Sequence, residues 1–243
     1  MTLIRAIDIE TVGFEPPKGD ASGIVEIGWC DLAPSEAGWR VAGGGSALIN
    51  PGCPIPPEAS AVHHLVDEDV AHAPPWHAVA PLVFTGEPVA YAAHNAKFER
   101  LWCTPAVAGD RSWICTHKGA LRLWREAPLH SNQGLRYWRR PDGLDRALAD
   151  MAHRAFPDAY VTAHHLRDLL QLASLDELIR WSSEPALQVR CQFGKHRGTS
   201  WSEVDTGFLR WVSERDFDED VLFTVKHEIE RRERAARAGS EAA

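Results

Sequence analysis

The sequence predicts an α/β domain followed by a small C-terminal α+β module. Three strand-like segments open the chain, later strand-like segments alternate with helical ones, and the character of the sequence changes after residue 187. We therefore expect one domain over residues 1–181 and a module over residues 187–237. The 243 residues contain 44% hydrophobic and 25% charged side chains, which is typical of soluble globular proteins.

Five segments have the pattern of strands. Segments 2–9 and 23–32 are rich in apolar and β-branched residues, and segment 38–50 contains a triple glycine typical of a bulge or a hairpin end. These three are expected to form an antiparallel meander. Segments 88–93 and 111–116 are shorter and alternate with helices, as in an α/β sheet.

Most of the other segments of the first domain have the pattern of helices. Short helices are expected within 57–83, and a further helix is expected to begin at Asn95 as its N-cap. Helical periodicity then runs from 117 to 180. Its clearest element is a helix over 158–173, which is expected to open at Asp158.

Residues 182–187 (SSEPAL) have the composition of a linker. The segments expected in the module beyond this linker are a short strand at 189–193, a basic turn bracketed by glycines at 194–198, and two amphipathic helices near 203–213 and 219–237.

Charge and cysteine content limit the classes of function. A net charge of −8 argues against a protein that coats duplex DNA, because such binding rests on many Lys and Arg contacts to phosphate. No stretch approaches the roughly 18 apolar residues of a transmembrane helix, and the N-terminus lacks the features of a signal peptide. Five cysteines without a CxxC pair indicate reduced thiols, so we expect a cytoplasmic protein that does not bind membranes.

Asp8 and Glu10 stand at the end of the first predicted strand. Residues i and i+2 of a strand face the same way, so both carboxylates leave the sheet together and can ligate one hard divalent cation. A D-x-E pattern by itself also fits exposed charges at a strand edge. The flanking sequence (LIRAIDI) argues against this, because an uncompensated pair is costly to bury among apolar residues.

Two further segments carry candidate polar groups. HNAKFE lies at a strand–turn–helix junction, where the sites of α/β sheets gather, although Glu99 also suits the first turn of a helix on electrostatic grounds. HRAFPD places a loop histidine, His153, ahead of Asp158 at the mouth of a helix. Histidine can act as a base near neutral pH, and the aspartate can ligate a metal ion.

In this order, these segments resemble the three motifs of the DEDDh (DnaQ-like) 3′-to-5′ exonuclease family. IDIETVGFE is similar to the first motif, HNAKFE to the second and HRAFPD to the third, and VEIGWCDL and NPGCPIPPEASAVHHL are similar to connecting segments. The resemblance covers about residues 3–175, and the tail resembles the C-terminal module of exodeoxyribonuclease X relatives. It implies a ribonuclease H-like fold with a mixed five-stranded sheet flanked by helices.

The resemblance also implies an activity and the residues that carry it. Relatives hydrolyse phosphodiester bonds at nucleic-acid 3′ ends with two divalent cations, Mg²⁺ or Mn²⁺. Asp8 would bridge both ions, and Glu10 and Asp158 would complete one site. His153 would deprotonate the attacking water, and Glu99 would be the remaining carboxylate. The residues that match positions seating the terminal nucleotide in relatives are Thr11, Val12, His63, Asn95 and Phe98.

One residue departs from the family pattern, which has aspartate where this chain has Glu99. The extra methylene shifts the carboxylate by about 1 Å, and a misplacement of that order can cost roughly 100-fold in rate. A metal-bound water could absorb the shift, if the group acts through one as the resemblance suggests. An active enzyme on DNA is therefore favoured, with two alternatives: an RNA-trimming exonuclease on the same fold, and a catalytically weak module that binds nucleic-acid ends.

The basic turn of the tail, GKHRG at 194–198, allows two interpretations. Cations interleaved with Phe193 and Trp201 suit a single nucleic-acid strand, whose phosphates pair with charges and whose bases stack on rings. The glycines equally suit a hairpin whose aromatic residues fill the core of the module.

Overall fold

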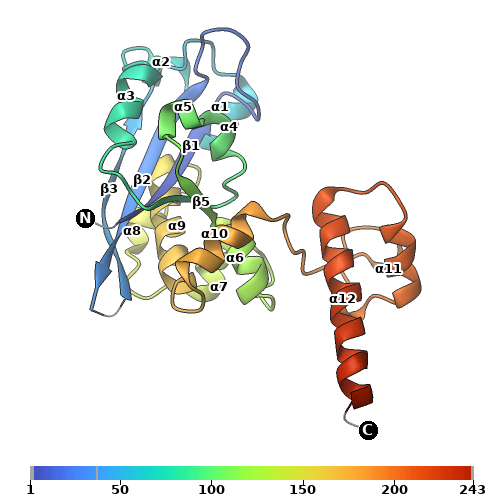
Figure 1. Cartoon of the computed structure of the whole chain (residues 1–243). Coiled ribbons are helices and arrows are strands. Elements are labelled where there is room, and N and C mark those ends of the chain that lie inside the picture. The colour runs from blue at the N-terminus through green and yellow to red at the C-terminus, as the bar shows by residue number, and fades with distance from the viewer. Residues whose placement is uncertain (1–2, 37, 242–243) are drawn as a thin grey trace.

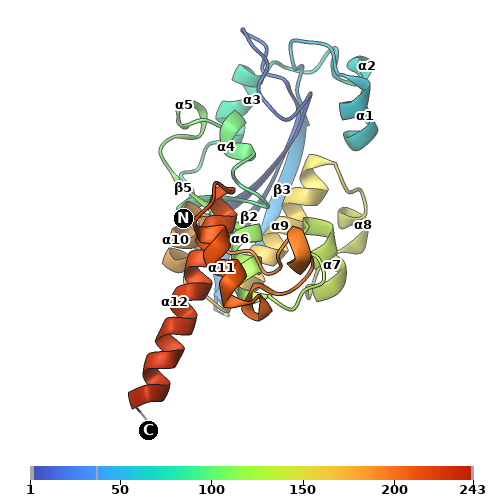
Figure 2. The same cartoon turned by 90° about the vertical axis from the view of Figure 1, so that its right-hand side faces the viewer.

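The computed structural model of the chain describes residues 3–36 and 38–241. An α/β part built around one sheet lies beside a smaller helical part, from which the last helix projects (Figures 1 and 2). The strands follow the order β3-β2-β1-β4-β5 across the sheet. Their bounds are β1 (Ile4–Thr11), β2 (Ile24–Ser35), β3 (Gly38–Leu48), β4 (Ala90–Ala93) and β5 (Ser112–Cys115).

Helices flank this sheet, and the longest of them crosses it. α9 contacts β1, β2, β3 and β4 on one face of the sheet. The helices of this part are α1 (Pro57–His63), α2 (Asp67–Val70), α3 (Trp76–Val83), α4 (Glu99–Trp102), α5 (Pro105–Ala108), α6 (Thr116–Leu123), α7 (Asn132–Arg139), α8 (Arg146–Ala149), α9 (Ala155–Leu169) and α10 (Leu175–Ser183).

The central strand, β1, has neighbours that run in opposite directions. It pairs antiparallel with β2 and parallel with β4, while β3 joins β2 antiparallel and β5 joins β4 parallel. Within the described residues, the expected meander and the mixed five-stranded sheet are therefore confirmed. Because β1 and β4 are parallel, their carboxyl ends reach the same edge of the sheet, which is where sites of such sheets form.

Both faces of β1 are buried, which explains its apolar sequence. Ile7 and Ile9 pack with side chains of α3 and α4, whereas Ala6 packs beneath α9 on the opposite face. Side chains alternate along a strand, so Asp8 and Glu10 share the face that α9 covers. The fold thus places both carboxylates between the central strand and the longest helix of the domain.

The predicted start of the helix at Asp158 was wrong. α9 begins at Ala155 with Arg154 as its N-cap, and it ends at Leu169. Pro157 fits the first turn, because an N–H at that position would have no helical partner. Asp158 therefore lies inside the first turn and does not cap the helix.

Asn95 is not the N-cap that the sequence predicted. Residues 94–98 form a turn, and α4 begins only at Glu99, with Phe98 before it. Asn95 has a φ of 82°, in the left-handed region that asparagine tolerates better than most residues. Its carbonyl accepts the N–H of Phe98 at 2.9 Å, so the residue closes a turn before the helix starts.

The C-terminal part contains its two expected helices around a small core. Its buried apolar residues are Cys191, Trp201, Val204, Leu209, Val212, Val221 and Val225. The expected strand at 189–193 was wrong, because pairing is limited to a bridge between Arg190 and Ser200. Short 3₁₀ helices on both sides of Ser200 prevent a longer ladder. They are η1 (Gly194–His196) and η2 (Trp201–Glu203), and the α-helices are α11 (Thr206–Ser213) and α12 (Glu219–Glu241).

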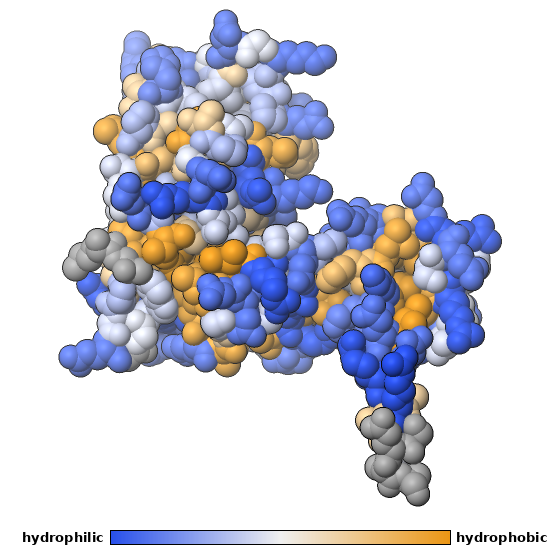
Figure 3. Space-filling model, in the orientation of Figure 1, coloured by the Kyte–Doolittle hydropathy of each residue, from blue (hydrophilic) through white to orange (hydrophobic). Residues whose placement is uncertain are grey.

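The predicted linker is held on both sides. Its first residues belong to α10, and Lys118 donates hydrogen bonds to the carbonyls of Ser182 and Glu184. Beyond Pro185, the N–H of Ala186 donates to Asp220 at 2.6 Å. Hydrophilic residues cover much of the projecting part of α12 (Figure 3). Among the described residues, no helix combines the length and apolar character needed to cross a membrane.

Candidate active site

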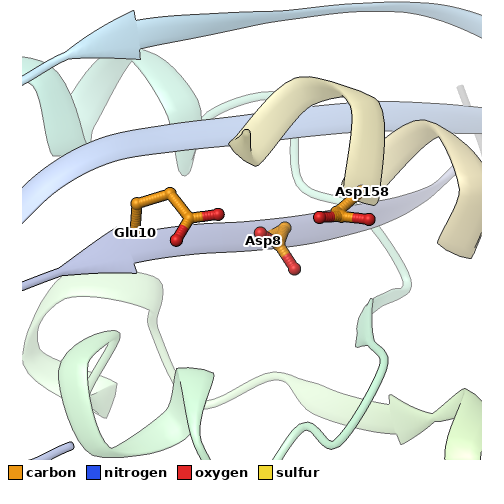
Figure 4. A group of neighbouring side chains, drawn as sticks. All are labelled: Asp8, Glu10 and Asp158. Atoms are coloured by element: carbon orange, nitrogen blue, oxygen red, sulfur yellow. The ribbon is translucent and has the colours of Figure 1, made fainter. Parts of the chain in front are cut away.

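Three carboxylates meet between β1 and the first turn of α9. Asp8, Glu10 and Asp158 each offer an oxygen, and these oxygens lie within 4.8 Å of one another (Figure 4). Two come from the central strand and the third comes from the helix that crosses it. Carboxylate oxygens are the ligands that Mg²⁺ and Mn²⁺ prefer in proteins, so the donor set fits a divalent cation.

A glycine allows α9 to approach the sheet this closely. Gly28 of β2 is the register partner of Asp8. A Cβ atom on Gly28 would lie 2.1 Å from the backbone carbon of Ala155, which is closer than atoms can pack. The first residue of α9 therefore rests on the Cα of Gly28, and Asp158 comes down beside Asp8 one helical turn later.

An ion pair between the half-buried Arg154 and the buried Glu26 fixes the same end of the helix. Arg154 donates two hydrogen bonds to Glu26 of β2, at 2.8 and 2.9 Å, and the N–H of Ala155 donates a third at 3.2 Å. Glu26 is 2% exposed and lies opposite Glu10 in the register of the sheet. This pair was not predicted from the sequence. Its signal in the sequence is Glu26, a carboxylate flanked by apolar residues near the start of the strand.

Asp158 has donors on both of its oxygens. Its Oδ1 accepts a hydrogen bond from Gln133 at 2.7 Å and a long one from Asn132 at 3.4 Å. Its Oδ2 accepts the backbone N–H of His153 at 2.7 Å. The carboxylate is therefore oriented by neighbouring groups of the protein. Two of them, Gln133 and Asn132, were not predicted from the sequence.

The electrostatics of the cluster favour a bound cation. Burial, and then the neighbouring carboxylates, raise the pKa of Asp8 well above its ordinary value. Burial and the charge of Asp158 raise the pKa of Glu10 to about 8. Both shifts express the cost of holding several negative charges together out of water. A divalent cation removes that cost, because it compensates the charges that repel one another.

Glu99 lies next to this cluster on the first turn of α4. Its side chain is buried, and its Oε2 atom has no hydrogen-bond partner among the described residues. Burial raises its pKa to about 8, and the charge of Glu10 acts in the same direction. The fourth carboxylate is thus close enough to interact with Glu10 and Asp8, without being one of the three whose oxygens converge.

His153 lies in the loop before α9 and is exposed. Its φ of 61° places its backbone in the left-handed region. The structure shows one contact of His153 with the cluster, the backbone N–H that Asp158 accepts. Among the described residues its imidazole has no hydrogen-bond partner, so the ring is free to meet a ligand from solvent.

The residues expected to seat a nucleotide form two groups at the carboxyl ends of β1 and β4. Thr11, Val12 and His63 make the first group. His63 is buried, and burial lowers its pKa, an effect that the neighbouring Thr11 backbone partly offsets. Asn95 and Phe98 make the second group, in the turn after β4. Phe98 packs against Trp102, whereas the Asn95 side chain is exposed.

The basic turn of the C-terminal part is engaged internally. Lys195 and His196 both contact the carboxylate of Asp205, at 3.1 and 2.8 Å. Phe193 stacks on Phe217 with ring centroids 4.7 Å apart, within the small core. These contacts support the interpretation of the turn as part of the module's own packing.

Known exonucleases resemble this chain in sequence and in structure. No family model matches the sequence. A structure of exonuclease X in complex with 5′-overhanging duplex DNA has 31% sequence identity and a TM-score of 0.58, covering 74% of this chain and 99% of that chain. The sequence of exodeoxyribonuclease 10 from Escherichia coli K12 is 33% identical over 240 residues, covering 94% of this chain and 99% of the relative. The chain belongs to the DEDDh 3′-to-5′ exonuclease family.

Family membership agrees with the fold. The nuclease domain of 3′hExo, described as a DEDDh family member bound to rAMP, has the same fold with a TM-score of 0.51. At 14% identity, with 70% of this chain and 92% of that domain covered, this likeness concerns the fold alone. The match to exodeoxyribonuclease 10 takes in most of the C-terminal part as well, because it spans 94% of the chain.

Proposed function

We propose that the protein is a metal-dependent 3′-to-5′ exodeoxyribonuclease that releases nucleotides from DNA 3′ ends. The observation that carries the proposal is the convergence of Asp8, Glu10 and Asp158 within 4.8 Å, in a chain of this family. DNA is favoured over RNA because a relative that matches 94% of this chain is named an exodeoxyribonuclease and the exonuclease X structure holds duplex DNA.

The three carboxylates are the residues that would hold two divalent cations, Mg²⁺ or Mn²⁺. Asp8 lies between Glu10 and Asp158 (Figure 4), which supports a role in which Asp8 would contact both ions and the other two carboxylates would complete one site. When bound, such a pair of ions activates water and stabilises the leaving oxygen of a phosphodiester. Glu99 adds a fourth negative charge at the edge of the cluster and is proposed to act through a bound water.

His153 is the proposed general base. Two observations support this role: the residue is exposed, and its backbone N–H is held by Asp158, which puts the loop next to the carboxylate cluster. A histidine in this place takes the proton of the attacking water, a role worth about 10²–10⁴ in rate. The backbone contact holds the loop at Asp158 without engaging the imidazole ring.

The terminal nucleotide is proposed to lie between the two groups at the carboxyl ends of β1 and β4. Thr11, Val12 and His63 would contact it from one side, and Asn95 and Phe98 from the other. None of these contacts requires a particular base, so we expect digestion with little sequence preference.

We further propose that residues 1–181 form the exonuclease domain and residues 187–237 a separate module. The module has its own buried core, which supports this division. All five cysteines are free, which supports action in a reducing, cytoplasmic compartment.

A digestion time course tests the proposal. DNA and RNA oligonucleotides of one sequence, labelled at the 3′ or the 5′ end, are incubated with Mg²⁺, Mn²⁺ or EDTA. The expected result is metal-dependent release of mononucleotides from the DNA 3′ end. Faster release from RNA would favour the trimming alternative, and binding of ends without release would favour the binding module. Asp8→Asn serves as the inactive control.

A further inference from the structure

A side chain of α7 donates a hydrogen bond to Asp158. Nε2 of Gln133 donates to Oδ1 of Asp158 at 2.7 Å, across 25 positions of sequence. Nη1 of Arg136, one turn further along α7, donates to the other end of the same amide, Oε1 of Gln133, at 3.1 Å. Arg136 is only 4% exposed. The three side chains form a line from the interior of the protein to the metal centre.

The guanidinium decides which way the Gln133 amide points. The oxygen and nitrogen ends of a glutamine amide have nearly the same shape, so packing alone does not choose between them. Arginine can only donate hydrogen bonds, and it therefore selects the oxygen. The NH₂ group is left facing Asp158, where a carboxylate can accept from it. In the opposite orientation, the amide oxygen would face the carboxylate and repel it.

Arg136 also holds the chain that leads to His153. Its guanidinium donates to the carbonyl of Ala149 and to the carboxylate of Asp150, both at 2.5 Å. The same buried cation therefore supports the amide that orients Asp158 and the segment just before the loop histidine. Because His153 in turn donates its N–H to Asp158, both oxygens of this carboxylate are fixed before a cation arrives.

We propose that Gln133 and Arg136 are positioning residues of the metal centre: Arg136 orients the Gln133 amide, and that amide fixes the rotation of Asp158 so that its free lone pairs face the cations. The inference rests on the proposed function in taking Asp158 as a metal ligand. Groups that orient a ligand in this way typically contribute about 10- to 100-fold to metal affinity.

The first test measures Mn²⁺ binding to the DNA-free protein by titration calorimetry. Gln133→Met keeps the size of the side chain and removes its donor, and we expect the dissociation constant for Mn²⁺ to rise by about 10- to 100-fold. Gln171→Met is the matched control, since Gln171 is exposed just beyond α9, and it should bind Mn²⁺ as the wild type does. Turnover of Gln133→Met should be low at limiting Mn²⁺ and recover as Mn²⁺ is raised.

The second test asks whether Arg136 acts through Gln133. Arg136→Met should also weaken Mn²⁺ binding, and combining it with Gln133→Met should add little more, because the two changes break one line of contacts. If Arg136→Met does not fold, Arg136→Lys replaces it. The one nitrogen of lysine cannot take the positions of both Nη1, which reaches Gln133 and Ala149, and Nη2, which reaches Asp150.

The outcomes separate this inference from the proposed function. Wild-type affinity for Mn²⁺ in Gln133→Met, with only a lower melting temperature, would overturn the positioning role and leave the exonuclease proposal intact. Wild-type protein that binds Mn²⁺ but digests no DNA would overturn the exonuclease proposal, while the affinity measurements would still decide the role of Gln133.

Discussion

Gly28 on β2 lies directly opposite Asp8 on β1, and the first residue of α9 occupies the space that a side chain on Gly28 would fill. The absence of one Cβ atom therefore decides how close a third carboxylate comes to the central strand. The geometry of the proposed metal centre therefore depends on this contact as well as on the carboxylates.

Gly28→Ala should damage both the fold and the site. The new methyl group would overlap the backbone of Ala155, which cannot move aside as a side chain could, so α9 must shift and carry Asp158 with it. Overpacking of this kind costs about 1–3 kcal/mol. Urea unfolding should show that loss, and calorimetry should show weaker Mn²⁺ binding. Gly43→Ala is the control, because a Cβ there meets nothing within 4 Å; equal behaviour of the two variants would contradict the argument.

His153→Gly should reduce turnover while leaving the metal site intact. Glycine accepts the positive φ of this position and retains the N–H that Asp158 binds. We expect the single-turnover rate to fall by about 10²–10⁴, Mn²⁺ affinity to stay unchanged, and added imidazole to restore part of the rate. His64→Gly is a close control, since His64 is also exposed and has a φ of 62°. A wild-type rate in His153→Gly would show that the ring is not the base.

Substitutions at Glu99 test whether the site fits the longer glutamate side chain or whether glutamate impairs the enzyme. Glu99 is buried next to the triad, and Asp would withdraw its carboxylate by about 1 Å. If the surroundings fit the longer side chain, as its burial suggests, Glu99→Asp should lower turnover several-fold and Glu99→Gln should lower it further by removing the charge. Higher turnover in Glu99→Asp would mean that glutamate impairs the enzyme. Equal rates in all three proteins would remove Glu99 from the mechanism.

The metal-free protein should lose stability as the pH rises. The pKa values of Glu10 and Glu99 are raised from 4.5 to about 8 in the fold, so between these values the unfolded chain holds fewer protons than the folded one. Stability therefore falls with rising pH through this interval and levels off above it. Buried histidines such as His63, whose pKa is lowered from 6.5, weaken the fold only on the acid side.

Melting temperatures measured in EDTA between pH 6.5 and 8.5 test this expectation. The wild type should melt lower at the alkaline end, and Glu10→Gln should flatten the slope because one of the repelling charges is gone. Saturating Mn²⁺ should raise the melting temperature most at alkaline pH. A wild-type melting temperature that rises with pH in EDTA would contradict the assignment.

The features that were predicted correctly from the sequence depend on residues close together in the chain. The alternation of β1 predicts that Asp8 and Glu10 share a face, and the order of the strand-like segments predicts the meander. The contacts that complete the site are not local. Arg154 and Glu26 are 128 positions apart, and the closeness of Ala155 to Gly28 depends on how a helix crosses a sheet. No periodicity in the sequence encodes such contacts.

The errors at Asn95 and Asp158 have a related cause. Both residues are good N-caps by type, but the turn after β4 uses Asn95 in the left-handed region, and the ion pair of Arg154 starts α9 one turn early. In each case a tertiary contact overrode a local preference. The amide of Gln133 could not have been assigned from sequence at all, because nothing there marks which residue of α7 faces Asp158.

Hydrogen bonds on either side of Pro185 restrict the backbone where the two parts of the chain join. Glu184 is fixed to α6 through Lys118 and Ala186 is fixed to α12 through Asp220, so little more than one residue remains to turn, and proline restricts its own φ. A rotation there would be transmitted along α12, whose 23 residues extend about 35 Å. A rotation of about 5° at Pro185 would therefore displace the far end of α12 by about 3 Å.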